Sequence, residues 1–146
     1  MRGFLVRFRT ASLISAAILG IGGGLVAATP ANAAASQCPQ GKVCLFHDKN
    51  FGGEMYITDG TCVPSLQGES FPGNYPTVND SVSSIVNNSG YTLRLFQNSG
   101  FGGRWTIAYA QVADFTQGLT IYNSDGTTSS STSFNDQLSS IWSTTC

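Results

Sequence analysis

Short apolar runs separated by small polar turns characterise the chain from residue 42 onwards. Residues 42–46 are apolar and partly β-branched, residues 47–50 are polar, and residues 53–58 carry Met55 and Ile57 on one face of an extended run. Side chains two positions apart share a face of a strand, so two such runs joined by a polar turn predict a hairpin. No later stretch sustains the 3.6-residue apolar period of a helix. The mature protein is expected to be mostly or wholly β.

The hairpin pattern occurs a second time, at an offset of 50 residues. Residues 92–96 and 104–109 repeat the two runs, with Trp105 and Ile107 at the positions of Met55 and Ile57. A second repeated motif, Asn-Asp-x-x-Ser-Ser followed by Ile, occupies residues 79–84 and 135–140. We call these two segments the signature loops. Their offset is 56 residues, so the second unit is longer by about six residues.

The chain is thus expected to contain two copies of one unit, residues 42–90 and 91–145. Residues 83–87 are predicted as the last strand of the first unit, and residues 118–122 are a candidate third strand of the second. Four short strands with one long connection suit a Greek key, and two Greek keys can close into an all-β sandwich. A single unit would bury too little apolar surface to be stable alone, so pairing of the units contributes to the folding free energy.

Two segments are expected to be loops. Three prolines exclude a central strand or a helix interior from residues 61–77, which are predicted to form a long irregular surface connection. Residues 123–133 are rich in Ser, Thr, Gly and Asp and are expected to form a flexible loop.

The first 33 residues have the composition of a secretory signal peptide. Arg2, Arg7 and Arg9 form a basic start, a Gly/Ala-rich apolar run spans residues 11–28, and residues 31–33 read Ala-Asn-Ala. Small residues in this pattern are typical of a cleavage site. The alternative is a membrane anchor, since the run is about long enough to span a bilayer. However, its glycines weaken it as a helix. We therefore expect a secreted mature chain of residues 34–146, a single domain without membrane attachment.

Charge and cysteine content limit the classes of partner that the mature chain is expected to bind. The chain has seven Lys and Arg against eight Asp and Glu, and cleavage would remove three arginines, so the net charge falls from −1 to −4. Such an acidic surface argues against nucleic acid as a binding partner and mildly favours a cation. An even number of cysteines in an oxidising compartment indicates two disulfides. Zinc is the competing use, but no C-x-x-C spacing occurs and His47 is the single histidine. The four cysteines are Cys38, Cys44, Cys62 and Cys146.

The pairing of these cysteines is open among three patterns. Antiparallel pairing of the first hairpin would place Cys38 near Cys62 and leave Cys44 for Cys146. A bond between Cys38 and Cys44 would instead close a short loop.

These residues resemble the βγ-crystallin superfamily. Its Greek keys carry an aromatic residue, four residues, an aromatic or apolar residue, and then x-Gly, as in Phe46-x4-Phe51-Gly52-Gly53 and Phe96-x4-Phe101-Gly102-Gly103. Its microbial calcium-binding members also carry the signature loop late in each unit. A narrower resemblance, to secreted bacterial metalloproteinase inhibitors of the same fold (peptidase inhibitor family 36), rests on Cys-Pro-x-Gly-x-Val-Cys-Leu-Phe at residues 38–46 and on residues 79–87.

The first resemblance implies a calcium site shared by the two units. Calcium takes about 6–8 oxygen ligands, and each signature loop supplies many oxygens but one carboxylate. By resemblance, each loop contributes to both of two ions, with backbone carbonyls of the loops and of turns 47–50 and 97–100 completing the shell. The implied side-chain ligands are Asp80, Ser83, Asp136 and Ser139, and the residues that position the loops are Asn79 and Asn135. The alternative is that these side chains only stabilise turns through local hydrogen bonds.

The second resemblance implies proteinase inhibition, possible partners being secreted metalloproteinases. Within residues 60–75, Cys62-Val63-Pro64 would be held by a disulfide and a proline, and a constrained loop loses less entropy on docking. The family inhibitor places its reactive bond beside a cysteine in the second unit, and residues 98–133 contain no cysteine. That site is therefore not transferable, and an ordinary crossover loop is the alternative for residues 60–75.

An enzyme is not expected. A Ser-His-Asp arrangement would require His47, which lies in a predicted turn without a nucleophile motif. The sequence therefore predicts a secreted, monomeric, non-enzymatic βγ-crystallin-type domain that binds up to two calcium ions, with a proteinase inhibitor acting through a surface loop as the alternative.

Overall fold

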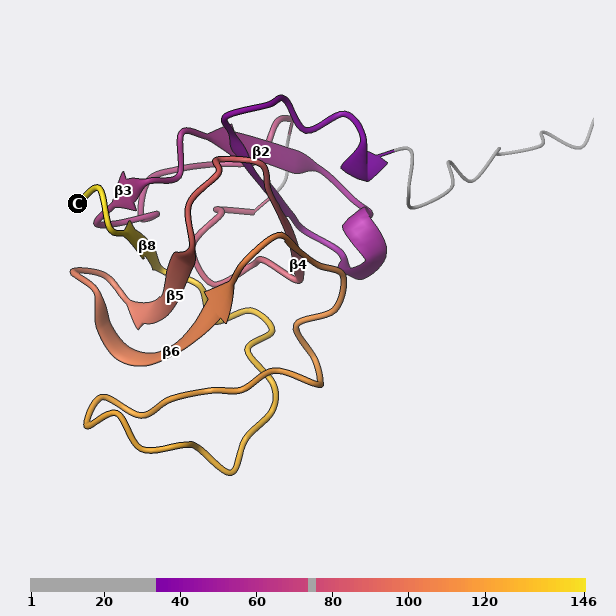
Figure 1. The fold of residues 1–146 in the computed structure, drawn as a ribbon. Coiled ribbons are helices and arrows are strands. Elements are labelled where there is room, and N and C mark those ends of the chain that lie inside the picture. The colour runs from indigo at the N-terminus through magenta and orange to yellow at the C-terminus, as the bar shows by residue number, and fades with distance from the viewer. Residues whose placement is uncertain (1–33, 74–75) are drawn as a thin grey trace, which may run out of the picture.

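Two four-stranded antiparallel sheets make up the fold (Figure 1). The computed structural model describes residues 34–73 and 76–146, so the predicted signal peptide lies outside the described residues. The first sheet contains, in spatial order, β2 (Met55–Thr58), β1 (Val43–Phe46), β4 (Ser84–Asn87) and β7 (Gln111–Val112). The second contains β3 (Cys62–Val63), β8 (Ser140–Ser143), β5 (Leu93–Asn98) and β6 (Gly102–Ala108). The predicted all-β fold is confirmed, and in the described part no helix has the length and hydropathy to cross a bilayer.

The third strand of each unit belongs to the sheet of the other unit. β3 pairs with β8, and β7 pairs with β4. Residues 61–77 contain no central strand, as predicted, but the expected irregular connection is wrong at Cys62–Val63, which form an edge strand. Pro64 limits this strand to two residues, and its position at the sheet edge tolerates a neighbouring proline. The third strand of the second unit is β7 rather than residues 118–122, where Tyr122 forms isolated bridges to Trp105 and Thr128.

The turns of the two hairpins are folded in the same way. The first contains a short 3-10 turn, η1 (Lys49–Phe51). In the first turn the backbone N–H of Phe51 donates to Ser84 Oγ at 3.1 Å, and that hydroxyl donates to the carbonyl of Asp48 at 2.6 Å. Ser140 makes the equivalent bonds with Phe101 and Asn98, at 3.1 and 2.6 Å. The last serine of each signature loop therefore fixes the folded turn of its own unit.

Glycine is required within these turns. Gly53 has a φ of 69°, and a Cβ there would lie 3.0 Å from the side chain of Asp48. Gly103 has a φ of 76° and would meet the side chain of Asn98 in the same way, at 2.9 Å. Positive φ and close approach together explain why both units carry the Phe-Gly-Gly motif.

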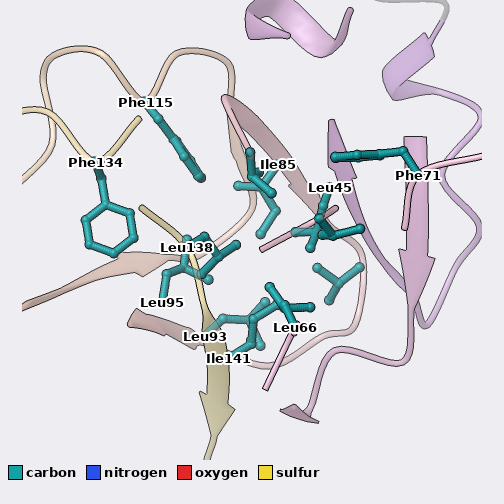
Figure 2. Packing of buried hydrophobic residues seen from close by; sticks show 14 of the residues in the cluster. Leu45, Leu66, Phe71, Ile85, Leu93, Leu95, Phe115, Phe134, Leu138 and Ile141 are labelled. Atoms are coloured by element: carbon teal, nitrogen blue, oxygen red, sulfur yellow. The ribbon is translucent and has the colours of Figure 1, made fainter. Parts of the chain in front are cut away.

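The sheets enclose an apolar core to which both units contribute (Figure 2). Leu45 and Ile85 of the first sheet and Leu93, Leu95 and Ile141 of the second are fully buried. Long connections complete the core with Leu66, Phe71, Val78, Val82, Phe115, Ile121, Phe134 and Leu138. Since neither sheet buries its inner face without the other, the units stabilise each other.

A second, smaller cluster covers the outer face of the first sheet. Cys38, Cys44, Phe46, Phe51 and Val86 are all buried there. Because this cluster covers the outer face, every residue of β1 is buried. In β5 of the second sheet burial alternates instead, and Arg94 is exposed between the buried residues Leu93 and Leu95.

The disulfides join Cys38 to Cys44 and Cys62 to Cys146. The pairing of Cys38 with Cys62, derived from extending the first hairpin, is wrong. The chain leaves the first sheet after β2, and Cys62 lies opposite Trp142 in the second sheet. The C-terminus lies beside β3 (Figure 1), which brings Cys146 within bonding distance of Cys62.

Residues 123–133, predicted as a flexible loop, begin with a hydrogen-bonded turn. The N–H of Asn123 donates to the carbonyl of Thr127 at 2.8 Å. Asp125 Oδ1 accepts from the hydroxyl and the N–H of Thr127, at 2.7 and 2.9 Å, and these hydrogen bonds lower the pKa of Asp125.

Candidate functional site

The two signature loops lie against each other, joined by reciprocal backbone hydrogen bonds. The N–H of Asp80 donates to the carbonyl of Leu138 at 3.1 Å, and the N–H of Asp136 donates to the carbonyl of Val82 at 3.2 Å. These bonds occupy equivalent positions in the two units. The two copies of the unit are therefore packed reciprocally at these loops.

Each loop holds its aspartate in a left-handed backbone conformation. The φ values are 57° for Asp80 and 52° for Asp136, a region where Asp and Asn are enriched among non-glycine residues. The preceding asparagine orients the carboxylate: Asn79 Nδ2 donates to Asp80 Oδ2 at 2.8 Å, and Asn135 Nδ2 donates to Asp136 Oδ2 at 2.7 Å. Both aspartates are exposed, so the loops present two carboxylates to solvent.

One hydrogen bond crosses between the side chains of the two loops. Ser139 Oγ donates to Asp80 Oδ1 at 3.0 Å, although the residues are 59 positions apart. Ser139 is 4% exposed and Ser83 is 8% exposed. Across the described residues, the equivalent pair of Ser83 and Asp136 has no such hydrogen bond. The structure thus brings together Asp80 and Ser139, two of the residues singled out from the sequence.

Both loops also contain an orphaned oxygen. Asn79 Oδ1 and Asn135 Oδ1 are buried and have no hydrogen-bond partner among the described residues. A buried acceptor without a partner costs about 1–3 kcal/mol, and here it occurs at the same position of both repeats. Amide, carboxylate and hydroxyl oxygens are the ligand types that calcium takes. This donor set matches the oxygen chemistry of calcium. In residues 34–73 and 76–146, however, no group of three or more His, Cys, Asp or Glu side chains that could hold a metal ion occurs.

Each asparagine combines two features. Its amide nitrogen donates to the carboxylate of the next residue. Its buried Oδ1 atom is an additional feature that only atomic packing could reveal. In the neighbouring turns the carbonyls of Asp48 and Asn98, expected as possible ligands, already accept hydrogen bonds from Ser84 and Ser140.

His47 lies at the end of the first hairpin, outside the signature loops. Its Nδ1 is 2.7 Å from Asp48 Oδ1, and its ring meets Phe71 edge to face at 5.7 Å. His47 itself is half-buried, whereas the side chain of Asp48 is exposed.

The candidate inhibitory residues Cys62, Val63 and Pro64 lie on and just after β3, at the edge of the second sheet. Cys62 is exposed and bonded to Cys146, and Val63 is half-buried against the core. The carbonyl of Pro64 accepts from the N–H of Gly100 at 2.7 Å, and the N–H of Leu66 donates to the carbonyl of Ser139 at 2.8 Å. The segment is therefore extended and held from one side, while within the described residues no strand pairs with the other side of β3.

Two Greek keys that exchange their third strands, with a signature loop late in each, define a βγ-crystallin fold. A solved structure described as "Evolution of the eye lens beta-gamma-crystallin domain fold" matches with a TM-score of 0.52 and 23% identity, over 71% of this chain and 85% of that one. A βγ-crystallin from Ciona intestinalis matches with a TM-score of 0.49 and 29% identity, over 70% of this chain and 99% of that one. For a βγ-crystallin from an archaeon the TM-score is 0.48 and the identity 22%, over 72% and 99% of the two chains.

The sequence also matches a narrower family than the fold does. The profile of peptidase inhibitor family I36 matches residues 31–108, more than half of the chain. The protein belongs to peptidase inhibitor family I36. Curated proteins give no significant match.

Proposed function

We propose that the protein is a secreted, monomeric, non-enzymatic domain that binds up to two calcium ions between its signature loops and is stabilised by them. The observation that carries this proposal is the contact of Ser139 with Asp80 across the two units. It supports a shared site, because each loop alone has one carboxylate and is too poor in negative charge to hold a divalent ion.

The proposed ligands are oxygens of both loops. Asp80 and Asp136 supply the carboxylates, and Ser83 and Ser139 supply hydroxyls. The orphaned Oδ1 atoms of the two asparagines support a role for these residues near the ion as well. When bound, calcium would supply the positive charge that these oxygens lack. With one carboxylate per ion, the dissociation constant is expected between about 10⁻⁷ and 10⁻³ M, the range of sensors and extracellular modules.

Isothermal titration of the mature protein tests this proposal. Calcium is expected to give saturable heat for up to two ions. Magnesium should bind more weakly, because it requires near-ideal octahedral geometry and gives up its waters reluctantly. Equal dissociation constants for the two metals, or no saturable heat with calcium up to millimolar concentration, would contradict a dedicated calcium site.

A second function is favoured by the family and by the edge strand. We propose that the extended segment at Cys62-Val63-Pro64 inhibits a secreted metalloproteinase. Proteins that bind an extended peptide often add it to an exposed sheet edge through backbone hydrogen bonds. Here such an edge is restrained by a disulfide, by the proline and by the hydrogen bonds of Pro64 and Leu66. Restraint of the segment before docking supports tight binding, because little entropy remains to be lost.

An inhibition assay with a thermolysin-type peptidase tests this second function. The mature protein is expected to inhibit, and Val63→Gly is expected to weaken inhibition by about tenfold or more, since it removes an apolar contact and frees the backbone. Ile57→Gly is the matched control, because Ile57 is a β-branched residue on the edge strand of the other sheet. Equal losses in both variants would indicate a general loss of stability rather than an inhibitory segment.

A further inference from the structure

The outer face of the second sheet carries a row of side chains that begins at the proposed inhibitory strand. The strand register pairs Cys62 with Trp142, Trp142 with Arg94, and Arg94 with Ile107. The four strands lie side by side in the order β3, β8, β5 and β6 (Figure 1). Cross-strand partners point to the same side of a sheet. We call this set of four residues the outer row.

Arg94 is held at the centre of the outer row by aromatic rings. Its guanidinium carbon lies 4.9 Å from the ring centroid of Trp105 and 5.1 Å from that of Trp142. Trp105 in turn stacks on Tyr122, with centroids 4.2 Å apart and an interplanar angle of 17°. Cation–π contacts of this kind orient a guanidinium and restrict its rotamers. Arg94 is nevertheless exposed, so its N–H groups remain accessible.

Arg94 differs from the other basic residues of the described part in the partners of its charged group. Lys42 and Lys49 pair with Asp59 and Asp114. Arg104 donates to Gln97 and Gln137, at 3.2 and 2.6 Å. In residues 34–73 and 76–146, the guanidinium of Arg94 has neither an ion pair nor a hydrogen bond. A guanidinium has five N–H donors suited to a carboxylate. In Arg94 these donors are oriented by two indoles, but no other described residue accepts a hydrogen bond from them.

The face around the outer row is also partly open and carries aromatic side chains. The corresponding face of the first sheet is covered by the cluster around Cys38 and Phe51. Next to Tyr122, by contrast, a cavity of about 230 Å³ is lined by residues that include Ile107, Tyr109 and Leu119. Tyr109 is 72% exposed. Trp, Tyr and Arg are the residue types that contribute most to protein interfaces.

We propose that Arg94, held between Trp105 and Trp142, is a second contact point for the peptidase that docks on β3, where it binds a carboxylate of the peptidase surface. This inference rests on the proposed inhibitory function. A typical interface buries about 800 Å² on each partner, far more than a two-residue strand can supply. Arg94 is two strands from Cys62, roughly 10 Å away. An unpaired cation in a predominantly acidic mature domain complements an acidic partner.

The test measures inhibition of a thermolysin-type peptidase by the full mature protein and its variants. Arg94→Gln is expected to weaken inhibition by roughly 10- to 100-fold, as removal of one member of a close interfacial charge pair does. Arg94→Lys should lie in between, because an ammonium keeps the charge but not the planar fork. Lys49→Gln, the control for loss of one positive charge, should inhibit as the unmodified protein does. Inhibition by the unmodified protein should weaken more with added salt than inhibition by Arg94→Gln.

Three results would overturn the proposal. Unchanged inhibition by Arg94→Gln, while Val63→Gly still loses inhibition, would reject the role of Arg94 and leave the proposed inhibitory function intact. Lack of inhibition by the unmodified protein would reject both. A concentration-dependent dimer, seen in sedimentation and abolished by Arg94→Gln, would identify a second copy of the chain as the occupant of this face. Thermal melting of each variant distinguishes loss of fold from loss of contact.

Discussion

Replacement of both Cys62 and Cys146 by serine is expected to lower the free energy of unfolding by about 4.5 kcal/mol, as the chain-entropy model gives for a closed loop of this length. The two cysteines are 84 residues apart in sequence, so their bond removes much of the freedom of the unfolded chain. The bond also joins the C-terminus to the edge strand β3, which has only two residues. Small domains are stable by about 5–15 kcal/mol in total. The variant should therefore be close to unfolded at physiological temperature.

The other disulfide provides the matched control. Cys38 and Cys44 are only 6 residues apart, and the same model gives about 2 kcal/mol for their bond. Urea unfolding followed by tryptophan fluorescence measures both variants, since Trp105 and Trp142 lie in the second sheet. If the variant without the short-loop disulfide were the less stable of the two, the entropic ranking would be wrong, and packing of Cys38 and Cys44 against Phe46 would be the larger effect.

Calcium at 100 times its dissociation constant is expected to stabilise the unmodified protein by about 2.7 kcal/mol. For a domain of this size the melting temperature should rise by roughly 10 °C. The variant with both Asp80→Asn and Asp136→Asn is expected to lose this response, because asparagine keeps the left-handed backbone but removes the only carboxylates of the signature loops. Without calcium the melting temperature of the variant should change little. Removal of exposed negative charges from an acidic chain stabilises it, and this gain offsets the loss of hydrogen bonds to the carboxylates.

Asp125→Asn is the control for this experiment. It makes the same chemical change in the turn at residues 123–127, away from the signature loops. Its melting temperature should rise with calcium as that of the unmodified protein does. Differential scanning calorimetry with calcium and with a chelator measures all three proteins. An equal rise in the variant with both signature-loop substitutions would place any calcium site elsewhere in the molecule.

Most strands could be predicted from the sequence because their signal is local. β1, β2, β5 and β6 agree with the predicted hairpin runs to within two residues, and β4 agrees with the predicted last strand. Alternating burial in β5 follows directly from the period of two residues in a strand. The Phe-Gly-Gly motifs also have a local cause, namely positive φ in a crowded turn.

The short strands β3 and β7 could not be predicted in the same way. Two residues are too few to show an alternation, and Pro64 directly after β3 reads as a loop signal. Their pairing partners, β8 and β4, belong to the other unit. The mistaken cysteine pairing has the same origin, because it extended a local hairpin past the point where the chain changes sheets.

By itself, the sequence determined the all-β class, the duplicated unit and the residue types of the signature loops, since each of these is recorded in spacing and composition along the chain. The tertiary structure alone decided which strands change sheets, which cysteines meet, that Ser139 contacts Asp80, and that Arg94 stands between two indoles. Those contacts join residues tens of positions apart. They arise because neither sheet can bury its inner face without the other, so the geometry of packing rather than the local pattern selects the partners.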